Sequence, residues 1–261
     1  MSELTLQVFG PLRVLDGAGS EIRIPSRKGR ALLAYLALRP SESHGRDRLA
    51  GLLWEEADEE LARTSLRQAI AALRRALPKS CQSALLTATD CVSLDGAAID
   101  CDLNRYRQAL SVATLSALQQ AAELYRGDLL EGFDARSAAF DEWLNNERLL
   151  LRRQASDTLQ KLTQVCAAND DLDGAATACS RLLALEPLNE AAHRTMMELH
   201  ARRGTYAEAL RQYRVCKDAL RRELDVAPEP ATEQLYRDLM RRGRANADAV
   251  LGDFAEQTND D

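Results

Sequence analysis

Residues 62–77 place arginine at a spacing that suits contact with an anion. This stretch reads ARTSLRQAIAALRRAL, and at about 100° per residue its leucine, isoleucine and most of its alanine side chains fall within one arc of a helix. The opposite arc holds arginine, threonine and glutamine and no acidic residue. Arginine can bind guanine through two hydrogen bonds, glutamine can bind adenine, and both can bind phosphate. The residues that we expect to contact DNA are therefore Arg63, Thr64, Arg67, Gln68, Arg74 and Arg75.

The alternative interpretation of this face is an ordinary solvated helix surface. A solvated helix usually mixes basic and acidic residues, since pairs of opposite charge one turn apart stabilise it. The basic face lacks that mixture, and the small side chain of Ala71 in its middle would let the backbone approach the floor of a groove. The helix alone leaves both interpretations open, and the neighbouring elements favour DNA binding.

The elements around this helix have the order of a winged helix-turn-helix. Alternating apolar residues predict strands in LTLQVFG (residues 4–10), in LRVL and in EIRI, which together form a small antiparallel sheet. A period of about 3.6 residues predicts a helix that begins near Ser26 and stops at Pro40. A short second helix follows at Arg46–Trp54, the basic helix is the third, and Leu85–Leu94 forms a hairpin that serves as the wing.

In a winged helix-turn-helix the third helix enters the major groove and the wing lies beside the DNA backbone. Basic residues near the starts of the first and second helices are then candidates for contact with phosphate. Ordinary surface charge is an equally good interpretation of each of them. These candidates are Arg27, Lys28, Arg46 and Arg48.

Charge is divided unequally along the chain. Residues 1–97 hold 13 of the 34 basic residues and 12 of the 40 acidic residues. The remainder holds 21 basic and 28 acidic residues. The net charge of −6 therefore belongs to the second part of the chain. Because the local potential steers association, a nearly neutral first domain can bind DNA if its positive charge gathers on one face.

The second part of the chain is predicted to be helical and to contain a repeat. A period of 34 residues aligns Asp170 with Gly204 and Ala175 with Ala209. This is the pattern of a tetratricopeptide repeat, in which a turn residue and a small residue let two antiparallel helices pack closely. The expected helices are 105–126, 138–168, 171–186, 188–203, 205–223 and 231–242.

These patterns together predict a mainly α protein with two domains. The first, at residues 1–97, is a winged helix-turn-helix with a small antiparallel sheet, three helices and a wing hairpin. The second, at residues 98–242, is all-α and tetratricopeptide-like, and a polar tail follows at residues 243–261. A hydrophobic content of 46% supports a well-buried core.

The sequence carries no signature of catalysis, of a metal site or of a cofactor site. It has no GxxxxGK[ST] phosphate-binding loop, no HExxH zinc motif and no GxSxG nucleophile motif. We therefore expect neither an enzyme nor a protein that holds a cofactor. His193 and His200 share one helical face with Met196, and we expect all three to pack in the helical core rather than to surround a metal.

The sequence also predicts a cytoplasmic protein that does not associate with membranes. No stretch approaches the roughly 20 apolar residues of a membrane helix, and the first residues lack the pattern of a signal peptide. The six cysteines include no CxxC pair, which favours reduced thiols. Cys81 and Cys91 flank a predicted strand of the wing, and a redox switch of DNA binding is the less favoured alternative.

An ordered series of motifs is similar to that of a known family of regulators. The runs RKGRALLAYLAL, RDRLAGLLW, ARTSLRQAIAALRRAL and LLT resemble the winged-helix domain of the Streptomyces antibiotic regulatory protein family, which is related to the effector domains of OmpR-type response regulators. LYRGDLLEGF (124–133) and FDEWLNNER (140–148) resemble the bacterial transcriptional activation domain that accompanies it, and the whole resemblance spans roughly residues 4–240. The wing departs from the family pattern at Asp90 and Cys91, where relatives usually place a Gly-Tyr pair.

This resemblance implies a sequence-specific transcriptional regulator. Members of the family are usually activators that bind direct repeats near a promoter and contact RNA polymerase, and their DNA-reading helix corresponds to residues 60–77 here. We therefore expect double-stranded DNA and RNA polymerase as partners, with a homodimer of the chain on tandem sites. The alternative is a tetratricopeptide-like interaction scaffold whose first domain docks an acidic protein partner.

Overall fold

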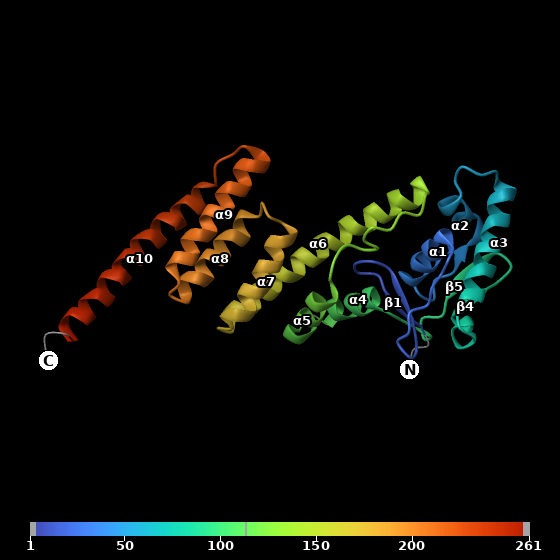
Figure 1. The fold of residues 1–261 in the computed structure, drawn as a ribbon, viewed down its shortest axis with the longest axis horizontal. Helices are drawn as coiled ribbons and strands as arrows, with labels where there is room; N and C mark the ends of the chain where they lie inside the picture. The colour runs from blue at the N-terminus through green and yellow to red at the C-terminus, as the bar shows by residue number, and fades with distance from the viewer. Residues whose placement is uncertain (1–3, 113, 258–261) are drawn as a thin grey trace. The chain divides into compact units, whose positions relative to one another are not determined.

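The chain forms two compact units, Met1–Ala155 and Ser156–Asp261 (Figure 1). The structure is a computed structural model that describes residues 4–112 and 114–257, with side chains described as far as residue 246. Within these residues, none of the helices combines the length and the apolar character needed to cross a membrane.

The first unit opens with a small sheet, as expected. β1 (Leu4–Gln7) pairs antiparallel with β2 (Arg13–Asp16), and its residues alternate between buried and half-buried positions as the pattern of LTLQ predicts. The third strand, β6 (Ile99–Cys101), pairs parallel with β1, so the sheet is mixed rather than purely antiparallel. The run EIRI, which was expected to be a strand, makes only an isolated bridge at Glu21.

Asp102 ties this sheet to the helices that follow it. It is the first residue of α4 (Asp102–Val112), and its carboxylate accepts hydrogen bonds from the N–H of Val8 at 2.9 Å and the N–H of Phe9 at 3.2 Å. Buried backbone N–H groups need such acceptors, so residues beyond position 97 complete the N-terminal sheet. The domain division after residue 97 stays a prediction, because the first compact unit of the structure continues to Ala155.

Three helices lie between the N-terminal sheet and the wing hairpin, as predicted. α1 (Arg27–Ala37) begins after Ser26, whose hydroxyl caps the helix by accepting the N–H of Gly29 at 3.0 Å. α2 (Arg46–Leu53) and α3 (Glu59–Ala76) complete the helix-turn-helix. The predicted apolar arc of α3 is buried, and the helix packs against α1 and α2.

The wing is the antiparallel hairpin of β4 (Leu85–Thr87) and β5 (Cys91–Leu94), which confirms the predicted hairpin. β5 also pairs with β3 (His44–Gly45), a strand not foreseen from the sequence, so the wing is anchored beside the start of α2. A 3-10 helix, η1 (Lys79–Ala84), connects α3 to the wing and contains Cys81. The structure describes all six cysteines, and none of them forms a disulfide.

The single helix predicted at residues 105–126 is wrong, because two helices occupy that stretch. α4 ends at Val112, and α5 (Leu115–Leu124) begins after Thr114, whose hydroxyl accepts a hydrogen bond from the N–H of Ala117 at 3.3 Å. A threonine cap starts a new helix without a glycine or proline to mark the break, so the apolar period alone could not reveal it. α6 (Ala138–Ala168) has the predicted bounds.

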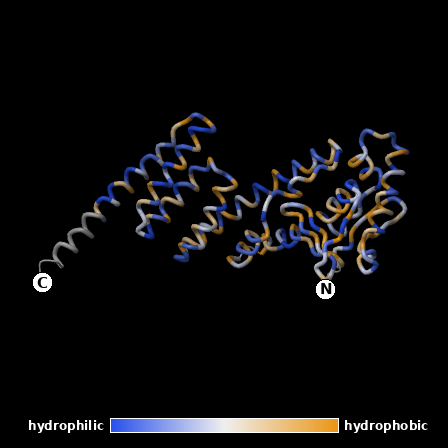
Figure 2. The backbone as a smooth tube through the Cα atoms, in the orientation of Figure 1, coloured by the Kyte–Doolittle hydropathy of each residue, from blue (hydrophilic) through white to orange (hydrophobic). Residues whose placement is uncertain are grey.

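The second unit contains α7 (Leu172–Leu185), α8 (Glu190–Arg202), α9 (Tyr206–Leu224) and α10 (Pro230–Gln257). Each of these helices packs against the next, and Figure 2 shows hydrophobic and hydrophilic stretches alternating along α7, α8 and α9. α10 runs into the segment 243–261, for which a polar tail is predicted.

The predicted repeat is visible in the backbone of this unit. Asp170 and Gly204, the aligned turn residues, both adopt the left-handed conformation, with φ of 60° and 74°. The aligned small residues Ala175 and Ala209 are both 0% exposed. The two helix pairs therefore turn and pack in the same way, which confirms the tetratricopeptide-like character of the unit.

The histidines of α8 lie in or near its packed side. His193 and Met196 are buried as predicted, and His200 is half-buried. The two ring nitrogens of His193 lie 2.9 Å from the carbonyl oxygen of Pro187 and 2.7 Å from the side-chain amide of Gln212. Polar groups of the protein therefore account for both nitrogens of this ring.

Candidate nucleic-acid interface

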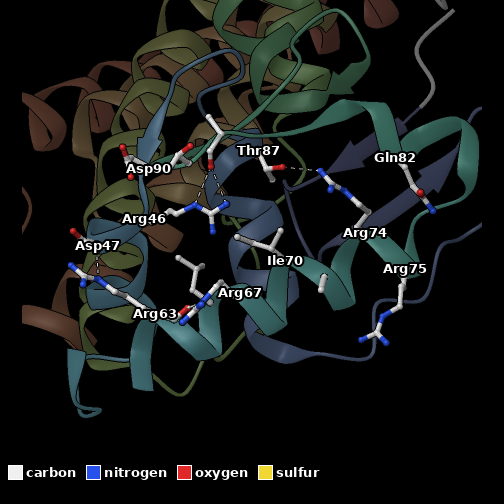
Figure 3. A pocket seen from close by; sticks show the side chains of 14 residues that line it. Arg46, Asp47, Arg63, Arg67, Ile70, Arg74, Arg75, Gln82, Thr87 and Asp90 are labelled. Carbon is white, nitrogen blue, oxygen red and sulfur yellow. Dashed lines mark hydrogen bonds and ion pairs between the residues drawn. The ribbon is translucent and has the colours of Figure 1, made fainter. Parts of the chain in front are cut away.

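An open hollow of about 1240 Å³ lies between α3, the start of α2 and the tip of the wing. Figure 3 shows arginine side chains from both helices around it. Its lining brings together four of the six residues predicted for the recognition helix and one of the four phosphate candidates. The charged residues of the lining are Arg46, Arg63, Arg67, Arg74 and Arg75, with Asp47 and Asp90.

The arginines of α3 face outward because the opposite side of the helix is fixed to the domain. Leu66 is 1% exposed and Leu73 is 0% exposed, whereas Arg67 and Arg74 are exposed. Ala71 lies in the middle of the basic face, is exposed and lines the hollow. Its small side chain leaves the backbone of α3 open to close approach.

Arg63 is held by two carboxylates at the edge of the hollow. Its Nε donates to Oδ1 of Asp47 on α2 at 2.7 Å, and its Nη2 lies 2.7 Å from Oε1 of Glu59, one turn earlier in α3. The hydrogen bond from Arg63 lowers the pKa of Asp47, and the same bond raises the pKa of Arg63. Both partners are therefore charged at neutral pH.

Arg67 forms hydrogen bonds with uncharged groups. Its Nη2 donates to the hydroxyl of Thr64 at 3.0 Å, and its Nε lies 3.5 Å from the carbonyl oxygen of Arg63. Arg75 lies farther along α3 and is exposed (Figure 3). In residues 4–112 and 114–246, no carboxylate forms an ion pair with Arg67 or Arg75, so their charges remain available to an anion.

Arg74 and Arg46 join the wing to the helices. Arg74 Nη2 donates to the carbonyl oxygen of Leu85 at 3.0 Å and to the hydroxyl of Thr87 at 3.1 Å. Arg46 donates from Nε and Nη2 to the carbonyl oxygen of Ala88, at 3.3 Å and 3.1 Å. These partners are neutral, so the two arginines fix the wing and keep their positive charge in the hollow. The shape of the hollow is thereby set before a ligand binds.

Arg27 and Lys28, both predicted to contact phosphate, are engaged elsewhere in the first unit. Arg27 pairs with Asp134 at 2.9 Å, and Lys28 Nζ donates to the carbonyl oxygens of Leu53 at 2.5 Å and Arg136 at 2.8 Å. Burial lowers the pKa of Lys28. The structure therefore places neither residue at the hollow, and Lys28 has carbonyl partners where a phosphate was expected.

Gln68 on α3 and Arg48 on α2 are exposed but do not line the hollow, and neither does Thr64, whose hydroxyl accepts a hydrogen bond from Arg67. Contacts of these residues with DNA stay predictions. The role of Asp47 has no direct sign in the sequence, because Asp47 lies 16 residues before Arg63 and meets it only where two helices come together. Its place in the first turn of the second helix was the one available signal.

A third helix and a wing that share an arginine-lined hollow define a DNA-binding domain of the winged-helix class. Comparison with known families agrees with this class. Residues 19–90 match the family described as "Transcriptional regulatory protein, C terminal", and residues 95–240 match the family described as "Bacterial transcriptional activator domain". The chain belongs to the bacterial transcriptional activator domain family.

Curated relatives extend the match over most of the chain. The transcriptional regulatory protein MoaR1 of Mycobacterium bovis and of Mycobacterium tuberculosis is 26% identical over 254 residues, covering 90% of this chain and 78% of MoaR1. The regulatory protein AfsR of Streptomyces coelicolor is 28% identical over 276 residues, covering 98% of this chain and 25% of AfsR.

A solved structure shares the fold. Mycobacterium tuberculosis EmbR, in complex with a low-affinity phosphopeptide, superimposes with a TM-score of 0.69 and 21% identity, covering 99% of this chain and 72% of EmbR. The families and relatives confirm the resemblance to the Streptomyces antibiotic regulatory proteins and the function of a DNA-binding transcriptional regulator. They do not favour the alternative of a protein-interaction scaffold.

Proposed function

We propose that this protein binds promoter DNA through the arginine-lined hollow and activates transcription from tandem sites. The observation that carries the proposal is the hollow itself, where five arginines stand against two aspartates. This surplus of positive charge sits on one face of a nearly neutral domain, which is what attraction to a polyanion requires. α3 would enter the major groove and the wing would lie on the adjacent backbone.

The arginines divide into contact residues and supporting residues. Arg67 and Arg75 are separated by about 12 Å along the axis of α3, which corresponds to roughly three to four base pairs of duplex. We assign base recognition to Arg67 together with Gln68, and phosphate contact to Arg75 and Arg46. Arg74 supports the wing through the bonds described above.

The proposal extends to partners beyond DNA. The excess of acidic residues lies outside residues 1–97, and the repeat helices offer surfaces for protein docking. We assign to these helices the contact with RNA polymerase and with a second copy of the chain on direct repeats. The protein would act in the cytoplasm, where bacterial DNA is transcribed, and as a regulator rather than an enzyme.

The direct experiment is binding-site selection from random duplexes with the full chain. We expect a preferred sequence whose affinity falls with salt, with a log–log slope of about −0.9 for each phosphate contacted. Arg67→Ala should weaken binding and relax the base preference. Arg23→Ala removes the same charge from an exposed position of the first unit, outside the hollow, and should leave affinity near the wild-type value. Selection without any preferred sequence, or equal loss from both variants, would contradict the proposal.

A further inference from the structure

Asp47 places a negative charge in a hollow that otherwise attracts an anion. The side chain of Asp47 is 70% exposed and that of Arg63 is 48% exposed. Exposed ion pairs contribute little to folding, so the pair adds little to the stability of the domain. The carboxylate would also repel DNA phosphate. Neither stability nor general affinity for DNA therefore accounts for its position.

The geometry around Arg63 suggests a different effect of the pair. A guanidinium donates from two edges, one formed by Nε and Nη2 and the other by Nη1 and Nη2. Asp47 accepts a hydrogen bond from Nε at 2.7 Å, and Oε1 of Glu59 forms an ion pair with Nη2 at 2.7 Å. Both contacts are made by atoms of the first edge, and neither of them is made by Nη1 of the second edge; Figure 3 shows the bond between Arg63 and Asp47. Two parallel N–H groups of this kind match O6 and N7 of guanine.

We infer that Asp47 is a positioning residue that orients Arg63 to recognise one guanine of the operator. This inference rests on the proposed function and deepens it, because it assigns base recognition to Arg63 and the support of that recognition to Asp47. Without the carboxylate, the long side chain of Arg63 samples more rotamers and can also reach phosphates or neighbouring bases. The domain would then bind DNA with less discrimination at that base pair.

Asp90 offers a matched control in the same hollow. It is exposed and lines the hollow from the wing, and its carboxylate forms no ion pair within the part of the chain that the structure describes. Asp90→Ala therefore removes the same charge as Asp47→Ala, but it releases no arginine. Any difference in base discrimination between the two variants therefore reflects the orientation of Arg63 and not the loss of a negative charge.

The test measures affinity of the full chain for the selected operator duplex and for duplexes with single base-pair substitutions. We expect Arg63→Ala to lower discrimination at one G·C pair by on the order of tenfold. Asp47→Ala should lower discrimination at that same pair, and the double variant should be no less discriminating there than Arg63→Ala alone. Asp90→Ala should keep the discrimination and bind every duplex somewhat more tightly.

Two results would overturn the inference and leave the proposed function intact. In the first, Asp47→Ala keeps full discrimination and binds all duplexes more tightly, which would mean that the carboxylate only masks charge. In the second, Arg63→Ala changes no base preference although Arg67→Ala weakens binding. Failure of the proposed function is a separate outcome, in which the wild-type chain selects no sequence. Thermal unfolding checks that the variants fold. If Asp47→Ala does not fold, the test is repeated with Asp47→Asn, which keeps the size of the side chain.

Discussion

Arg74 of α3 donates a hydrogen bond to the hydroxyl of Thr87 on the wing at a distance of 3.1 Å. The same guanidinium reaches the carbonyl oxygen of Leu85 at 3.0 Å, so one side chain joins the recognition helix to both ends of β4. A basic residue expected to contact DNA is thus also the residue that sets the distance between the helix and the wing.

Arg74→Ala should therefore loosen the wing and weaken binding to all duplexes alike. Loss of a hydrogen bond worth about 1 kcal/mol corresponds to roughly fivefold faster amide exchange, which hydrogen-exchange mass spectrometry would measure at residues 85–94. Arg75→Ala is the control, because Arg75 forms no hydrogen bond to the wing among the residues that the structure describes. Unchanged exchange in Arg74→Ala would show that the wing does not depend on this bond.

Asp102→Ala should destabilise the first unit by about 1–3 kcal/mol, because the buried N–H groups of Val8 and Phe9 would lose their acceptor. Chemical denaturation of the full chain measures this loss. Asp100→Ala is the comparison, since Asp100 pairs with Arg105 at 3.2 Å near the surface and should contribute less. Equal losses from the two variants would contradict the role of Asp102 in the sheet.

His44 makes the stability of the first unit sensitive to acid. His44 is 2% exposed, and the centroid of its ring lies 5.1 Å from that of Tyr35. Burial lowers the pKa of His44 and the charges of Arg48 and Arg39 lower it further, whereas the charge of Glu42 and a hydrogen bond to the backbone of Arg39 raise it. The unfolded chain therefore binds a proton more tightly than the folded chain. The contribution of His44 to stability is full above the unfolded pKa of about 6.5 and is lost as the pH falls from there toward the folded value.

We expect the free energy of unfolding of the wild type to fall between about pH 7 and about pH 5, and to fall less in His44→Phe. Phenylalanine keeps a ring against Tyr35 but binds no proton. His193 and His200, whose pKa values burial also lowers, titrate in both proteins, so the difference between the two pH profiles isolates His44. Parallel profiles would contradict the prediction.

Gly204 and Asp170 test the repeat directly, because they share the left-handed turn position. A side chain with a Cβ is strained in that conformation by roughly 1–2 kcal/mol. Gly204→Ala should therefore destabilise the second unit by about 1 kcal/mol. Asp170→Gly should stabilise the second unit by a smaller amount, because it also removes the ion pair between Asp170 and Arg202 at 2.8 Å. Denaturation of the full chain measures both, and shifts of the same sign would contradict the equivalence of the two turns.

Local patterns were sufficient to predict the elements that carry the hollow. The spacing of Leu66, Ile70 and Leu73 identifies the buried face of α3, and it leaves the arginines on the opposite face. The hairpin at residues 85–94 follows from short alternating runs. Both features depend on residues close together in the sequence, where helix and strand periods are visible.

Features that depend on contacts between distant segments could not be predicted in this way. β6 has three residues, too few to show a period, and it pairs with β1, which lies near the start of the chain. Asp47 neutralises part of the basic face only because α2 crosses α3. Lys28 has the type and place of a phosphate ligand, but the carbonyl of Arg136, far along the chain, accepts its hydrogen bond.

The central claim, that DNA lies in the hollow, is tested most directly by crosslinking at Ala71. Ala71→Cys puts a thiol on the exposed floor of the hollow, where a duplex carrying a thiol-tethered base can form a disulfide with it. Val215→Cys, at a position 50% exposed on α9, is the matched control, and the wild type measures the background from Cys91. We predict that the selected operator crosslinks to Ala71→Cys and stays near background with Val215→Cys. Operator that is bound but does not crosslink to Ala71→Cys, or that crosslinks equally to both variants, would contradict the claim.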